Sequence, residues 1–597
     1  MPGKKRKSLL LRFLLWRTKY LSHRQFLLIL SAVIGFLSGL VAVVLKNLTH
    51  FIQLLLEGEL IVNYHDAFYF IFPLVGLLLT YLIIKFGVRN KIGNGIPTTL
   101  YAISQRKGLI RNFQSYASML TAPVTVGFGG SVGLEAPTVI TGAAISSNLS
   151  RIFKMNQATR TLLIGCAAAG AMSSLFKAPI AAIIFAIEIF ALDLTLVSMI
   201  PLLLASVSAI LTSYFFFGND IILHYSLTDE FDITEVPFYI LLGVVASVCS
   251  VYFTKIYFRL TGKFDKIGSP LFRLLIGGAG LGILVFFIPP LYGEGYDVIN
   301  SLLEGDYLAA LGSNLFDEYL DNFFVVVLLL AGLVVFKIIA TAFTIGAGGV
   351  GGIFAPVLFM GSAMGHCFAL IFNNLGVLRS PLSLSNFTLV GMAGLMAGIM
   401  HAPLTAIFLI AELTRGYDLF VPLMITAAIS FAITNQFQPH SVYTMDLASR
   451  GELITHNKDQ AVLTLLNINQ VIEKNFVPLN INMNLGDVIK EGVVKSSRNI
   501  FPVIDDDKGF RGIILLDDLR PIMFQQNLYN EVKVSEIMQS APEIIYLDRD
   551  RMSDVMNKFQ QSTAWNLPVV KDDKYVGFVS KSKLLTAYRQ KLIEVTV

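Results

Sequence analysis

Charged side chains are scarce in this sequence. Asp, Glu, Lys and Arg make up 15% of its 597 residues, whereas soluble domains carry about a quarter. Between Arg111 and Arg151 the only charged residue is Glu135, but from Gly451 onward charged residues become frequent. The shortage excludes a wholly soluble protein. It predicts a multi-pass body in a lipid bilayer, followed by a soluble tail.

Cysteine and the common catalytic motifs are also lacking. Only Cys166, Cys249 and Cys367 are present, far apart in apolar runs, so they give neither a disulfide framework nor a metal-ligand spacing. The chain contains no Gly-x-x-x-x-Gly-Lys-Ser/Thr phosphate loop and no His-Glu-x-x-His zinc motif. We therefore expect no enzyme activity, no catalytic or metal-binding residues and no required cofactor.

The formal net charge of +5 comes mainly from the N-terminus, where eight Lys and Arg residues lie in the first 24 positions. Basic residues beside a first apolar span indicate a cytoplasmic N-terminus rather than nucleic-acid binding. A signal peptide is the alternative, but the apolar run 9–15 is short, is broken by Arg12 and has no small-residue cleavage site after it. We expect residues 1–24 to form an uncleaved basic segment at the membrane interface.

The body contains apolar stretches of two kinds. Residues 25–45 and 196–217 are long enough, at about 20 residues, to span a bilayer. Residues 117–128, 354–372 and 403–413 are short or interrupted by Gly and Pro. Broken helices occur at membrane depth only where protein or a water-filled cavity surrounds them. When such pieces recur in two halves of a chain, they indicate a transport site.

The body repeats. Gly133-Leu-Glu-Ala-Pro137 is echoed by Gly352-Ile-Phe-Ala-Pro356, 219 residues further on (352 − 133). A second pair of prolines, Pro179 and Pro403, repeats at nearly the same offset, 224 residues (403 − 179). Two motifs at nearly one offset predict that the membrane body is a two-fold repeat.

A glutamate follows each proline of the second pair by nine residues, at Glu188 and Glu412. Because they hold matching places in the two repeats, we expect these acids to bind helix ends or buried hydroxyls. A direct part in transport is the alternative.

Glu135 is a charged residue in an otherwise uncharged stretch of the membrane body. An ionisable group at the centre of a membrane helix costs at least about 2.5–3.5 kcal/mol. It follows a glycine-rich run and precedes Pro137, which suits the first turn of a helix. Free N–H groups and the helix dipole favour a negative charge there by about 0.3–2 kcal/mol. We expect the Glu135 carboxylate to occupy an anion site and to leave it when protonated, which would couple anion passage to pH. The alternative is that Glu135 only caps the helix.

Three motifs carry a family resemblance. Gly93-Asn-Gly-Ile-Pro97, Gly133-Leu-Glu-Ala-Pro137 and Gly352-Ile-Phe-Ala-Pro356 resemble, in order, the anion-site motifs of the CLC family of chloride channels and chloride/proton antiporters. The likeness covers residues 25–445. It implies an all-α polytopic homodimer in the cell membrane, an inverted-repeat bundle of tilted and broken helices with one pore per subunit. The implied gate is Glu135, and the implied anion-binding residues are Asn94, Leu134, Ile353, Phe354 and Tyr443.

Two positions depart from the family pattern. Asn94 stands where the family usually has Ser, which leaves nitrate or fluoride as alternatives to chloride as the small inorganic anion carried. Ile189 stands where proton-coupled members commonly carry a second glutamate, which favours a gated channel. A proton-coupled antiporter is the alternative, because a water chain can replace a side-chain relay.

The soluble tail repeats too. Phe501-Pro-Val-Ile and Leu567-Pro-Val-Val each begin a strand, an Asp-rich turn, a second strand and a helix. This α/β repeat resembles a cytoplasmic pair of CBS domains, which implies that the tail regulates transport. Some CBS domains bind adenine nucleotides through a hydroxyl and an Asp three residues later. The first unit has Asp518 without the hydroxyl, and the second has Ser580 without the acid. These half-patterns favour a dimerisation and scaffolding module over a nucleotide site.

The expected organisation follows from these boundaries. It comprises a basic N-terminus at 1–24, a transport domain at 25–445 with repeat halves at about 25–217 and 236–437, a linker at 446–475, and CBS units at 476–530 and 531–597.

Overall fold

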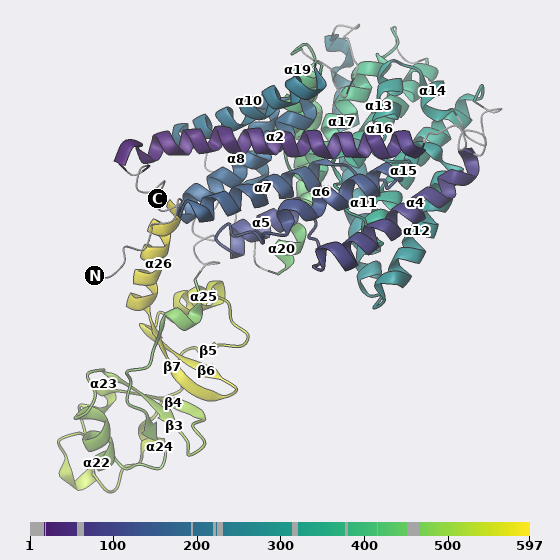
Figure 1. The fold of residues 1–597 in the computed structure, drawn as a ribbon. Coiled ribbons are helices and arrows are strands. Elements are labelled where there is room, and N and C mark those ends of the chain that lie inside the picture. Colours follow the sequence, from purple (N-terminus) through teal and green to yellow (C-terminus); the bar gives the residue numbers. More distant parts are fainter. Residues whose placement is uncertain are drawn as a thin grey trace, which may run out of the picture. The chain divides into compact units, whose positions relative to one another are not determined.

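The computed structural model of the chain describes residues 17, 19–56, 65–192, 195–218, 223, 231–312, 320–376, 380–414, 416–450 and 466–596. They belong to two compact units, Met1–Glu452 and Leu453–Val597, traced in Figure 1. Residues 1–16 of the expected interfacial segment and residues 451–465 of the expected linker lie outside the described residues.

The first unit is helical and consists of two successive sets. The first set contains α2 (His23–Leu56), α4 (His65–Leu82), η1 (Ile83–Val88), α5 (Ile96–Gln105), α6 (Gln114–Gly127), α7 (Glu135–Ile152), α8 (Gln157–Phe176), α9 (Pro179–Phe190) and α10 (Leu196–Phe217). The second contains η2 (Ile233–Glu235), α11 (Val236–Asp265), α12 (Pro270–Phe287), η3 (Pro289–Leu291), α13 (Tyr296–Leu303), α14 (Tyr307–Leu311), α15 (Phe323–Gly346), α16 (Phe354–Asn374), α17 (Leu384–Met400), α18 (Pro403–Leu413) and α19 (Phe420–Phe437), before the short α20 (Met445–Ser449).

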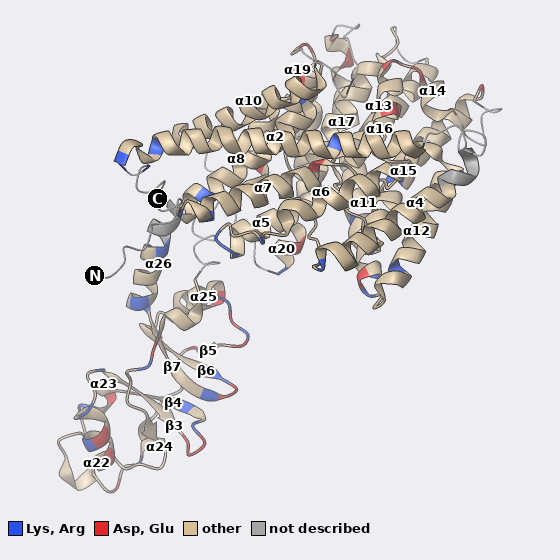
Figure 2. Cartoon of the chain, in the orientation of Figure 1, with Lys and Arg blue, Asp and Glu red and all other residues tan. Residues whose placement is uncertain are grey.

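Among the described residues, nine helical segments are long and apolar enough to cross a membrane. Their outward side chains are apolar: Leu196 and Phe215 of α10 and Phe324 of α15 are among the most exposed residues of the unit, as contact with lipid requires. Figure 2 shows how sparsely charged residues occur along these helices. The prediction of a multi-pass membrane body is confirmed.

One helix corrects the sequence interpretation. Residues 354–372, expected to be an interrupted piece, belong to the continuous 21-residue helix α16, which is long enough to span a membrane. Pro356 falls in its first turn, where proline removes no hydrogen bond. Although apolar, α16 is almost wholly enclosed by protein, so it is a core helix of the unit.

The second unit contains two sheets. One has the order β2 (Leu479–Asn480), β3 (Ile500–Ile504), β4 (Phe510–Leu515), and the other the order β1 (Ile472–Glu473), β7 (Lys574–Ser580), β6 (Asn566–Lys571), β5 (Ile545–Tyr546). Pro502 lies opposite Ile513 and Pro568 opposite Phe578 in equivalent antiparallel pairs, so the predicted repeat is confirmed. The main helices are α22 (Leu485–Asp487), α23 (Leu516–Leu519), α24 (Val534–Ile537), α25 (Met552–Ser562) and α26 (Lys581–Thr596).

Strand β1 connects the two repeats of the tail. It lies within the expected linker, before the first repeat, yet it pairs with β7 of the second repeat. Each repeat also buries its own apolar cluster, around Val503 and Ile514 in the first and around Val569 and Val579 in the second.

Candidate functional site

The two glycine motifs of the membrane unit meet. The backbone N–H of Gly133 donates to the carbonyl of Gly352 at 2.9 Å, and the N–H of Gly352 donates to the carbonyl of Gly133 at 2.7 Å. Helices α7 and α16 begin two residues after these glycines, at Glu135 and Phe354. Two helix starts, 219 residues apart in sequence (352 − 133), therefore lie together in the protein interior.

Close packing explains why glycines stand at this junction. A Cβ added at Gly133 would lie 2.1 Å from Oε2 of Glu135, and one added at Gly352 would lie 3.0 Å from Cβ of Ala136. Gly95, whose φ is +59°, also approaches Ala136, to 2.6 Å from an added Cβ. The third motif, at residues 93–97, therefore packs on the start of α7 as well.

Glu135 is held by one side-chain hydrogen bond. Its side chain is buried, with 2% of the residue exposed, and its Oε1 accepts a hydrogen bond from the hydroxyl of Tyr296 at 2.8 Å. Its Oε2 makes no hydrogen bond of good geometry to the described groups, although the backbone N–H groups of Glu135 and Ala355 interact with the carboxylate. An ionised carboxylate oxygen in that state is costly unless a ligand or a proton compensates it.

Ile353 and Phe354 form the start of α16. Because these residues stand at the start of the helix, their backbone N–H groups have no intrahelical partners. Both side chains are buried, and the Phe354 ring packs against Phe176 with centroids 5.0 Å apart. The start of α16 is therefore enclosed by protein.

Tyr443 lies within the same region. It is buried, and its hydroxyl contacts the sulfur of Met400 at 4.0 Å. A thioether is a weak acceptor, so the hydroxyl can donate to a better one. The Tyr443 hydroxyl and the Glu135 carboxylate also interact electrostatically.

Asn94 and Leu134 differ in their surroundings. The side chain of Asn94 is exposed, and it is the following glycine that contacts α7. The backbone N–H of Leu134 already donates to Oε1 of Glu294 at 2.9 Å. The Leu134 amide is therefore occupied by a carboxylate in this structure.

Sequence reasoning missed Glu294, Tyr296 and Lys337. Glu294 and Tyr296 belong to the segment Gly293-Glu-Gly-Tyr296, which leads into α13 and ends on its first residue. Lys337 of α15 is fully buried and donates to the carbonyls of Leu291 and Gly293 at 3.3 and 3.0 Å. Two features of the sequence could have identified these residues: an acid between two glycines, and a lysine inside an apolar helix.

The paired glutamates bind helix starts across the two halves. Glu188 of α9 accepts hydrogen bonds from the N–H groups of Leu404 and Thr405 in α18 at 3.0 and 2.8 Å. Glu412 of α18 accepts them from Ile180 and Ala181 in α9, also at 3.0 and 2.8 Å. The prediction that both acids bind helix ends is confirmed.

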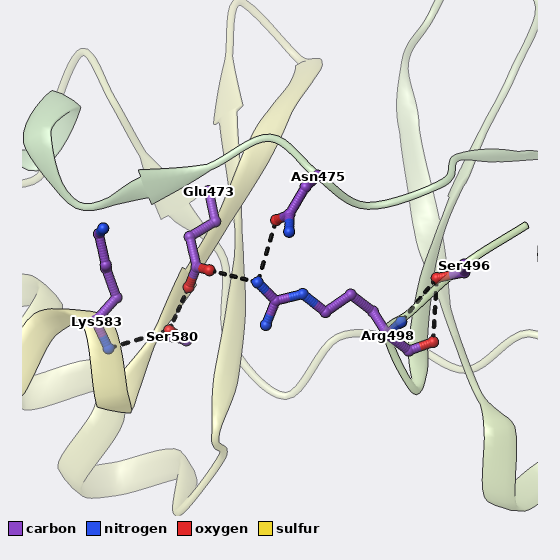
Figure 3. Close-up of polar contacts among 6 residues, drawn as sticks. All are labelled: Glu473, Asn475, Ser496, Arg498, Ser580 and Lys583. Atoms are coloured by element: carbon purple, nitrogen blue, oxygen red, sulfur yellow. Dashed lines mark hydrogen bonds and ion pairs between the residues drawn. The ribbon is translucent and has the colours of Figure 1, made fainter.

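A separate pocket of about 320 Å³ lies in the tail. The hydroxyl of Ser580 donates to the carboxylate of Glu473 in β1, and Glu473 also pairs with Arg498 at 2.7 Å (Figure 3). Lys583 lines the same pocket. Asp518 lies elsewhere, where it accepts a hydrogen bond from the N–H of Leu515 at 3.2 Å. The two halves of the nucleotide pattern are therefore not brought together.

Comparison with known proteins is consistent with this geometry. Residues 75–435 match the family model described as voltage gated chloride channel, and residues 468–524 and 534–590 match the CBS domain. The H(+)/Cl(-) exchange transporter ClcA of Vibrio cholerae serotype O1 is 28% identical over 433 residues, which cover 68% of this chain and 86% of that protein. The voltage-gated ClC-type chloride channel ClcB of Citrobacter koseri is 27% identical over 356 residues, covering 59% and 80%.

A crystal structure shares the fold. The slow cyanobacterial Cl−/H+ antiporter matches with a TM-score of 0.61 and 22% identity, over 72% of this chain and 98% of that one. The helical unit therefore has the CLC-type fold that the family resemblance implied. The chain belongs to the voltage-gated chloride channel family, CLC, and carries a CBS domain pair in its C-terminal part.

Proposed function

We propose that this protein transports small anions, chloride foremost, across a membrane through one pathway in each chain, with Glu135 as the gate. The observation that carries the proposal is the buried junction of Gly133 and Gly352 beside Oε2 of Glu135, which makes no hydrogen bond of good geometry to the part of the chain that the structure describes. Helix starts offer unpaired N–H groups and the positive end of a dipole, which hold an anion without a fixed cation. Such binding is weak enough to let the ion leave.

Glu135 would act as a tethered anion. While ionised, it occupies the space between the two helix starts and competes with a permeating ion. After it takes up a proton, it no longer attracts the amides, and an anion replaces it. The backbone amides of Ile353 and Phe354 and the hydroxyl of Tyr443 are the ligands we assign to that anion.

The transport mode has two candidates. Ile189 is buried and apolar at the position where proton-coupled members carry a glutamate, and this favours a channel. Proton-coupled exchange is the second candidate, favoured by the placement of Glu294 next to the gate. Because Asn94 stands where the family usually has Ser, nitrate and fluoride are the alternative substrates.

The test is anion flux from liposomes that contain the purified full-length protein. Chloride, nitrate and fluoride are compared at an acidic and at a neutral pH, with proton movement recorded in parallel. Anion efflux that drives uphill proton uptake identifies the exchanger, and its absence identifies the channel. No flux of any of the three anions would contradict the proposal.

The gate is tested with Glu135→Gln, which imitates the protonated carboxyl. We expect the variant to keep a high flux at neutral pH and to lose most of the pH dependence. The matched control is Glu304→Gln, because Glu304 is an exposed acid at the end of α13. A Glu135→Gln profile that coincides with the control would remove Glu135 from the gate.

We also propose a homodimer in the cell membrane with both chain ends on the cytoplasmic side. The basic residues before α2 support this orientation. Labelling of single cysteines introduced near each end, from outside intact cells, tests it: both should stay unlabelled.

A further inference from the structure

A second carboxylate lies at the start of α7. Oε1 of Glu294 accepts a hydrogen bond from the backbone N–H of Leu134 at 2.9 Å. Leu134 immediately precedes the first residue of α7, so its N–H is one of the donors that a helix start leaves free. The Glu294 carboxylate therefore holds a donor that a permeating anion could otherwise use.

The loop that carries Glu294 also reaches the gate. Tyr296, two residues further on, donates its hydroxyl proton to Oε1 of Glu135 at 2.8 Å. Among the described residues, the charged and titratable groups that interact with Glu294 come from four elements: Glu135 of α7, Tyr296 of α13, Lys337 of α15 and Lys46 of α2. Glu294 thus interacts with a second acid and with two lysines.

Packing fixes this loop in place. Lys337 donates to the carbonyls of Leu291 and Gly293, and its Nζ lies 4.4 Å from the centroid of the Phe359 ring. Gly295 has a φ of +86°, and a Cβ added there would lie 2.5 Å from the same ring. The position of Glu294 is therefore determined by a buried lysine and a glycine, as expected of a built site.

We propose that Glu294 is a second gating carboxylate, an inference that rests on the proposed role of Glu135. While ionised, Glu294 occupies the Leu134 amide and repels both the Glu135 carboxylate and incoming anions. When it takes up a proton from water, it yields the amide to the anion, and Glu135 loses a like-charged neighbour. Two interacting carboxyls titrate as a coupled pair, so flux responds to pH over a wider range than one carboxyl would give.

The experiment is chloride flux against pH for the full-length protein in liposomes. Glu294→Gln replaces a charge-assisted hydrogen bond with a neutral one, so we expect about a fivefold higher flux at neutral pH and a narrower pH response. Glu135→Gln alone should keep a residual pH response, and the double variant should have none. Glu304→Gln, the exposed acid, should match the unmodified protein.

Each outcome is decisive. If Glu294→Gln matches Glu304→Gln while Glu135→Gln flattens the profile, the inference fails and the proposed gate stands. If Glu135→Gln also matches the control, the proposed gate fails as well. If Glu294→Gln lowers both the flux at every pH and the melting temperature, Glu294 only holds the loop, and the inference is overturned.

Discussion

At the level of single residues, neighbouring atoms decide which side chains fit at the start of α7. Gly133 and Gly352 have backbone angles that other residues tolerate, since neither is among the residues with positive φ. What excludes a side chain is the neighbour: an added Cβ at Gly133 would lie 2.1 Å from Oε2 of Glu135. The glycine makes room for the carboxylate.

Gly133→Ala should therefore displace the gate. The added methyl group and Oε2 cannot occupy the same space, so we expect the Glu135 carboxylate to leave its place and the flux to become nearly independent of pH. The measurement is chloride flux from liposomes at an acidic and a neutral pH. Gly262→Ala is the control, because no atom of the described residues lies within 4 Å of a Cβ added at Gly262 of α11, and alanine in a helix stabilises by about 0.5–1 kcal/mol relative to glycine. An unaltered pH response in Gly133→Ala would show that the carboxylate is not confined there.

Glu135 and Glu294 differ in how far the sequence could predict their positions. Glu135 was predicted because its signals are local: a glycine-rich run before it, a proline after it and no other charge nearby. Glu294 was not, because its partner amide lies 160 residues away in sequence. An acid between two glycines ordinarily indicates an exposed turn. Only the packing of α15 and α16 around the loop places that acid against α7.

At the scale of elements, the two halves are tied together by reciprocal caps. Helices α9 and α18 each begin with proline, which supplies no N–H group, and the next two N–H groups of each bind a glutamate of the other. The repeat in the sequence predicted the equivalence of these helices and the capping role of the acids. It could not predict that each acid would cross to the opposite half, because that depends on how the halves pack.

Glu412→Gln tests this arrangement. A neutral amide accepts weaker hydrogen bonds from Ile180 and Ala181 than a carboxylate does, so we expect a loss of about 1–3 kcal/mol in the free energy of unfolding. Thermal unfolding in detergent measures it, and Glu188→Gln should have a similar effect at the start of α18. Both variants should keep the pH response of chloride flux. A changed pH response at unchanged stability would instead assign these acids to transport.

At the scale of the whole molecule, the chain joins a membrane body with few charges to a tail that has its own apolar cores. The tail sequence predicted its repeats correctly, because strand, turn and helix signals are local. It could not show that β1 pairs with β7, which brings Glu473 against Ser580. That contact bears directly on what the tail can bind.

We expect the full-length protein to bind AMP and ATP more weakly than about 1 mM. The hydroxyl of Ser580 is already engaged by Glu473, and Lys583 stands where the nucleotide-binding pattern needs an Asp. Equilibrium dialysis with labelled nucleotide measures this. Lys583→Asp supplies the missing acid, and it should raise the nucleotide affinity if the lack of that acid is what weakens binding. Saturable binding by the unmodified protein that Ser580→Ala abolishes would contradict the expectation, because it would mean that a nucleotide can displace Glu473 from the hydroxyl.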